Sequence, residues 1–155
     1  MGAEVLFQHG KATVPDALDT QHAIVLHNRA GVALYPYVMF LEPSTYEIKL
    51  VYQSTKRTDP PIRPRGTLQL GRSPERRDPW YFHIPPGRTR DVFILKVLLS
   101  TKPLDLAAME QKPVFGLDDS GKPNWLDAEE RSVNTSGMGL MPGRWMAFTR
   151  CIIVE

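Results

Sequence analysis

The sequence has few of the features that usually mark a secreted or membrane protein. Its 155 residues contain one cysteine, Cys151, so no disulfide can form within the chain. No apolar run approaches the ~20 residues that a membrane-spanning helix needs. The first residues lack the basic segment and the apolar run of a signal peptide. We therefore expect a protein of a reducing compartment and predict a cytoplasmic location.

Catalytic motifs are also lacking. The chain contains no Gly-x-Ser-x-Gly, no glycine-rich phosphate loop and no Gly-x-Gly-x-x-Gly. Cys151, the one candidate thiol nucleophile, lies in "MAFTRCIIV", a setting typical of a small buried side chain. No pair among the four histidines has metal-ligand spacing: His9, His22, His27 and His83. We predict no enzymatic activity, no catalytic residue, no cofactor and no metal.

Proline and short alternating segments are abundant instead. Fourteen prolines interrupt the chain, and proline is unfavourable within helices and central strands. Only 104–111, "LDLAAMEQ", is weakly helical, so the long helices of a parallel α/β fold are missing. Strand-like segments lie at 22–28, 32–42, 45–53, 66–71, 79–87, 91–99 and 144–155. The pattern predicts an all-β fold, a β-sandwich or jelly-roll-like domain of seven to eight strands with at most one or two short helical turns.

Two segments are apolar on both faces. In 34–41 and in 91–99, successive side chains point to opposite sides, and nearly all of them are apolar. Such segments are typical of strands in the middle of a sandwich, and we expect 91–99 to be one. Pro36 predicts an edge strand or a bulge within the first segment.

Residues 21–155 form one predicted domain, and 1–20 form a predicted flexible N-terminal segment. The first twenty residues have no sustained periodicity. Within them, "EVLFQHG" is similar to a viral-protease tag site, with His9 in place of a glycine. This stretch is either a tag remnant or a coincidence, and we give it no part in function.

The middle of the chain is basic. Residues 56–90 hold nine lysines and arginines against three acidic residues, while the rest of the chain is acidic. Phosphate contacts and base stacking could make this segment bind nucleic acid or acidic lipid. The alternative is that these arginines pair with the acidic flanks. The candidate anion-binding residues are Arg63, Arg65, Arg72, Arg76, Arg77, Arg88 and Arg90, with Trp80 and Tyr81 as candidate stacking residues. A lectin-like carbohydrate site using Trp80 and Trp125 is a further alternative, by analogy of fold.

Several stretches resemble a family. "LHNRAGVALYPYVMFLEPSTYEIKLVY", "PPIRPRGTLQLG", "DVFILKVLLSTKPLDLAAMEQKPVF" and the terminal "FTRCIIV" are similar to the C-terminal module of fungal caspase-like, metacaspase-related proteins. The resemblance covers about residues 22–154 and excludes the protease domain. It implies a β-sandwich accessory domain with no proteolytic residues. The leading hypothesis is a non-catalytic module for protein interaction, or for packing on a caspase-like domain in the same or another chain.

Overall fold

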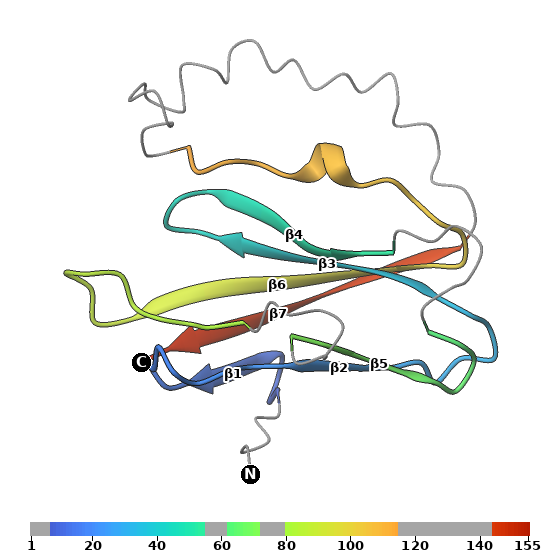
Figure 1. Cartoon of the computed structure of the whole chain (residues 1–155), viewed down its shortest axis with the longest axis horizontal. Helices are drawn as coiled ribbons and strands as arrows, with labels where there is room; N and C mark the ends of the chain where they lie inside the picture. Colours follow the sequence, from blue (N-terminus) through green and yellow to red (C-terminus); the bar gives the residue numbers. More distant parts are fainter. Residues whose placement is uncertain (1–6, 55–61, 72–79, 115–143) are drawn as a thin grey trace.

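The described part of the chain folds into seven strands in two sheets. The computed structural model describes residues 7–54, 62–71, 80–114 and 144–155. Within these ranges the only helical element is the 3₁₀ turn η1 (Ala107–Met109). Figure 1 shows the strands: β1 (Lys11–Val14), β2 (Ile24–His27), β3 (Tyr35–Glu42), β4 (Glu47–Gln53), β5 (Thr67–Leu70), β6 (Asp91–Ser100) and β7 (Trp145–Val154). The prediction of an all-β fold is confirmed.

The larger sheet has five strands in the order β1-β7-β6-β3-β4, and the smaller sheet pairs β2 with β5. All neighbours are antiparallel except β1 and β7, which are parallel. Strand β6 lies at the centre of the larger sheet, between β7 and β3, as its two apolar faces predict. Pro36 pairs only with β6, because pairing with β4 begins at Tyr37, and the register with β4 shifts between Val38 and Met39. The predicted irregularity near this proline is therefore present.

The two faces of the larger sheet pack against different partners. The inner face meets the smaller sheet in the main core, where Val38, Leu95 and Val97 from the larger sheet pack with Leu26 and Leu70 from the smaller one. The outer face carries a second cluster, in which segment 101–114 covers the sheet. Its members are Tyr35, Tyr37, Leu98 and Leu106, with Leu50, Leu104 and Met109 packed against them. Both faces of β3 and β6 are thus covered, as expected.

The outer edge of β4 is closed by the same segment. Ile48 and Gln111 exchange both backbone hydrogen bonds, each 2.9 Å long, and the Val114 amide donates to the Thr45 carbonyl at 2.8 Å. The Leu50 amide donates to the Glu110 carboxylate. Figure 1 shows this segment running alongside β4. Pairing of this kind makes a sheet edge less available to a second chain.

Two expectations differ from the structure. Residues 79–87 are predicted as a strand, but the described part, 80–87, forms only a bridge between His22 and Trp80. Its alternation reflects Trp80, Phe82 and Ile84 packing on the core, and the prolines that follow remove ladder donors. Conversely, four residues within the N-terminal segment expected to lie outside the sheet form β1, because they pair with the distant β7.

Candidate functional site

The predicted anion-binding arginines do not gather into one site among the described residues. Arg63 and Arg65 are exposed beside β5, whereas Arg88 and Arg90 lie just before β6. Three others lie outside the described residues: Arg72, Arg76 and Arg77. Among the described arginines of this set, the two pairs that lie on the same segment are therefore those that are already close in the sequence.

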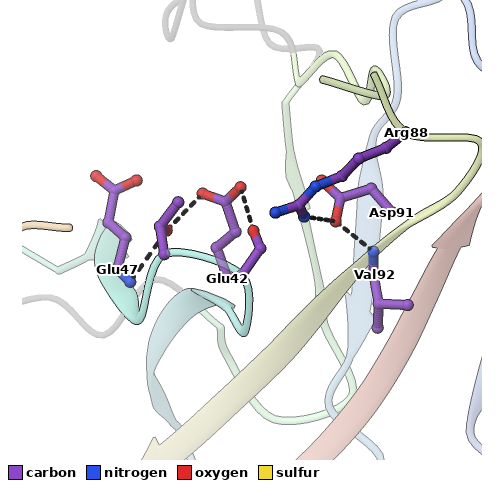
Figure 2. A network of polar contacts seen from close by, with 7 residues as sticks. Glu42, Glu47, Arg88, Asp91 and Val92 are labelled. Atoms are coloured by element: carbon purple, nitrogen blue, oxygen red, sulfur yellow. Dashed lines mark hydrogen bonds and ion pairs between the residues drawn. The ribbon is translucent and has the colours of Figure 1, made fainter. Parts of the chain in front are cut away.

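Arg88 and Arg90 already have acidic partners. Figure 2 shows Arg88 beside the buried Asp91, with 3.6 Å between the guanidinium Nη1 and carboxylate Oδ1. The same Oδ1 accepts a hydrogen bond from the Val92 amide at 2.9 Å. Arg90 Nη2 lies 2.6 Å from Glu155 Oε2 at the surface. For these two arginines, the structure shows the alternative to anion binding, in which arginines of the basic segment pair with acidic residues outside it.

The predicted stacking residues are divided between core and surface. Trp80 is half-buried and packs edge-on against Phe40, with ring centroids 5.0 Å apart. Tyr81 is exposed, and its hydroxyl accepts a hydrogen bond from the Gln21 side chain. Trp125, the second residue of the lectin-like alternative, lies outside the described residues. No pair of aromatic rings is therefore displayed as a stacking platform in the part that the structure describes.

No metal-binding arrangement is found among the described residues. They contain no group of three or more His, Cys, Asp or Glu side chains placed to hold a metal. Cys151 is half-buried in β7. Burial lowers the pKa of His22, whose ring packs on Phe82 and whose Nε2 has no hydrogen-bond partner among the described residues. None of the described helical segments is long and apolar enough to cross a membrane.

A different site is formed by the first half of β7. Strand β6 pairs with all ten residues of β7, but β1 pairs only with Cys151–Val154. Residues 145–150 therefore have no neighbouring strand on the β1 side within the described ranges. We call this six-residue stretch the open edge of β7.

Backbone groups along the open edge point alternately toward β6 and away from it. The Cys151 amide donates to Gly10 on the β1 side, and the Arg144 carbonyl accepts from Thr101 on the β6 side. Because the backbone of a paired strand alternates with a period of two, odd-numbered residues direct their N–H and C=O groups outward. Trp145, Ala147 and Thr149 thus present backbone donors and acceptors to an incoming strand.

Side chains at the open edge are apolar and cationic. Trp145 is 54% exposed and Met146 is 58% exposed, large fractions for such apolar residues. The Arg150 guanidinium lies over the Phe148 ring, 5.1 Å from its centroid, and donates to the Thr149 carbonyl at 3.0 Å. Among the described residues, neither Arg144 nor Arg150 forms an ion pair. The open edge and the residue just before it therefore carry two positive charges without a carboxylate partner in these ranges.

A cavity of about 180 Å³ adjoins the open edge, between the two sheets. Its wall includes Phe148 and Arg150 from β7, Leu95 and Val97 from β6, and the whole of β2. Engineered apolar cavities of ~150 Å³ hold a benzene molecule, so this space is large enough for one aromatic ring. Within the described ranges, the site therefore combines backbone groups that no second strand pairs, an apolar cavity and two arginines without a carboxylate partner.

Asn28 holds the wall of this cavity in place at the end of β2. Its side-chain amide donates to the carbonyls of Val32 at 2.7 Å and Arg63 at 3.0 Å, and its Oδ1 accepts from the Ala30 amide. The Asn28 amide also donates to the Gly66 carbonyl. These bonds fix the loops on either side of β2 and β5, so the cavity has a defined wall.

Comparison of the chain with protein-family models, curated proteins and solved structures finds no match. The sequence does predict a strong final strand at 144–155, but the open edge itself escapes sequence analysis. Nothing in the alternation of "RWMAFTRCIIVE" distinguishes the half that β1 covers from the half that it leaves open. Arg144 and Arg150 are six residues apart, which gives no recognisable motif.

Proposed function

We propose that this chain is a non-catalytic β-sandwich module that binds another protein by adding a strand from that protein to the open edge of β7. Strand addition uses backbone hydrogen bonds for affinity and side-chain pockets for specificity. The observation that carries the proposal is that, among the described residues, 145–150 of β7 have no strand neighbour on the β1 side, beside exposed Trp145 and Met146.

The other sheet edges support this choice of surface. The β4 edge is occupied by segment 110–114, and β1 is only four residues long. The strands of the smaller sheet are also four residues each. Proteins usually protect sheet edges from unwanted pairing by keeping them short or covered. The open edge of β7, with six residues and large apolar side chains, lacks this protection in the described part of the chain. Exposed aromatic residues and methionine are enriched where proteins bind one another.

The resemblance to the module of fungal caspase-like proteins suggests the partner. In that family the module accompanies a protease domain, so a caspase-like domain, in the same or another chain, is the partner that we propose. In this proposal, the contribution of the chain is binding and packing.

Gel filtration of an equimolar mixture tests the proposal. We expect the chain to co-elute with a purified fungal caspase-like protease domain, and we expect Ala147→Pro to weaken the complex. The proline removes an outward N–H without removing a bond to β6. The matched control is Lys49→Glu, an exposed position on β4 at the opposite side of the sheet.

Two results would contradict the proposal. One is separate elution of the two proteins at all concentrations tested. The other is hydrolysis of Arg- or Lys-directed peptide substrates by the purified chain, with loss of this activity in Cys151→Ala, because such a result would make the module an enzyme.

A further inference from the structure

We infer that the strand received by the open edge is an acidic one, with two carboxylates six residues apart and an apolar side chain between them that enters the inter-sheet cavity. This inference rests on the proposed function and specifies the chemistry of the bound segment. It follows from the direction of the side chains on each face of β7.

On the inner face of this strand, one cation lies at each end of the stretch: Arg144, just before the open edge, and Arg150, its last residue. Alternation places Arg144, Met146, Phe148 and Arg150 on one side of the strand, the side on which Phe148 contacts the main core. At ~3.3 Å per residue, the two arginine Cα atoms are separated by about 20 Å. A strand paired residue for residue with β7 would place its first and seventh side chains opposite these two arginines.

The cavity indicates which kind of side chain the bound strand carries between its two carboxylates. Phe148 and Arg150 both line it, so a side chain opposite Phe148 lies over its mouth. Side chains directly opposite each other on paired strands have Cβ atoms ~5 Å apart, within reach of an aromatic ring. A partner strand with carboxylates at its ends and apolar residues at its third and fifth positions matches this face.

Adding a partner strand would leave neither the Thr149 carbonyl nor the Arg150 guanidinium without a hydrogen-bond partner. Arg150 now donates to the Thr149 carbonyl, which is one of the outward-facing groups. An incoming backbone amide would take over that carbonyl, and the guanidinium would turn to the partner's carboxylate. The exchange keeps both groups hydrogen-bonded, and a charged acceptor gives the arginine a stronger bond than a neutral carbonyl.

The same charges disfavour a second copy of this chain as the occupant. In the two-fold antiparallel register that pairs the most residues, Ala147 lies opposite Ala147 of the other copy. That register sets Arg144 opposite Arg150 at each end, and like charges directly opposite each other destabilise paired strands. An acidic segment of a different protein would instead place carboxylates opposite Arg144 and Arg150, where a second copy would place arginines.

Fluorescence anisotropy with a labelled probe peptide tests the inference. The probe is Glu-Thr-Phe-Thr-Phe-Thr-Glu, which reads identically in both directions at the positions that matter. We expect saturable binding that weakens with salt, because exposed charge pairs are screened. Reversing both arginines, in Arg144→Glu/Arg150→Glu, should weaken binding roughly tenfold. A probe with lysine at both ends should bind this double variant and not the wild-type chain.

Further variants separate the contributions. Ala147→Pro should also weaken binding roughly tenfold by removing an edge donor, while Lys49→Glu should leave it unchanged. A probe with alanine in place of both phenylalanines should bind more weakly than the original. Circular dichroism checks that each variant is folded, and the charge-exchange result stands even if the proline variant unfolds.

The possible outcomes are distinct. Equal binding of the glutamate and lysine probes, or no binding of either, overturns the inference. If the probes fail while the chain still co-elutes with the protease domain, the proposed function stands and the acidic strand is wrong. Self-association of the wild-type chain that Ala147→Pro abolishes would identify a second copy as the occupant and overturn the inference as well.

Discussion

Replacing Leu95 by alanine tests the central role of β6 in the fold. Leu95 is 1% exposed, pairs with Phe40 on one side and Arg150 on the other, and lies in the main core. The substitution removes three carbon atoms, and each buried methylene contributes ~0.8 kcal/mol, which gives about 2.4 kcal/mol. Leu95 also lines the inter-sheet cavity, so the truncation enlarges a space that is already present.

The enlarged cavity adds a second penalty. Its neighbours belong to two sheets held in register by backbone ladders, so they can close over the gap only in part. We expect a total loss of about 3–4 kcal/mol in the free energy of unfolding. Since domains of this kind are usually stable by about 5–15 kcal/mol, the variant should still fold.

Urea denaturation followed by tryptophan fluorescence measures this loss. The matched control is Ile94→Ala, because Ile94 is the next residue of β6 but is half-buried on the opposite face. It should cost about 1 kcal/mol, in proportion to its smaller burial. A loss below about 1 kcal/mol for Leu95→Ala, or equal losses for both variants, would refute the assignment of Leu95 to the main core.

Three further predictions concern single contacts. Tyr37→Phe should cost about 1–2 kcal/mol in urea denaturation, because the buried phenol accepts the Leu104 amide at 2.5 Å and tethers the segment over the outer face; an unchanged midpoint would argue against this tether. Gly71→Ala should cost at least about 2 kcal/mol, because Gly71 has φ +86° and an added Cβ would lie 2.7 Å from the His22 carbonyl oxygen; a freely tolerated alanine would contradict that geometry. Burial lowers the pKa of His22, so the unfolded chain takes up its proton first and stability should fall as the pH drops below about 6.5. His22→Gln should reduce the difference in urea midpoint between about pH 7.5 and about pH 5.5, and the same difference in both proteins would show that His22 is not responsible.

Local periodicity accounts for what could be predicted about the strands. A strand exposes successive side chains on opposite faces, so the order of apolar residues in 34–41 and 91–99 shows which of them share a face and that both faces are covered. The structure confirms this division, with Leu95 and Val97 in the main core and Leu98 in the outer cluster. The same periodicity gave a false strand at 79–87, because alternation reports burial and does not require a paired ladder.

Strand partners could not be predicted in the same way. β1 exists because Lys11 pairs with Cys151, 140 positions later in the chain, and four residues are too few to show a period. The closure of β4 by Gln111 likewise depends on a contact that alternation does not encode. The open edge is the consequence of these pairings, since it is the part of β7 that the short β1 does not reach.

The sequence by itself therefore determined the all-β class, the faces of the long strands and the central position of β6, since these depend on side chains that are neighbours along the chain. Only the tertiary structure decided which arginines are paired with carboxylates and which residues of β7 lack a second neighbouring strand in the described part of the chain. Charges far apart in the sequence, such as Arg90 and Glu155, meet only when the sheet is assembled. For the same reason, Arg144 and Arg150 can be recognised as a pair of candidate binding residues only in the assembled sheet, where β1 does not pair with the stretch between them.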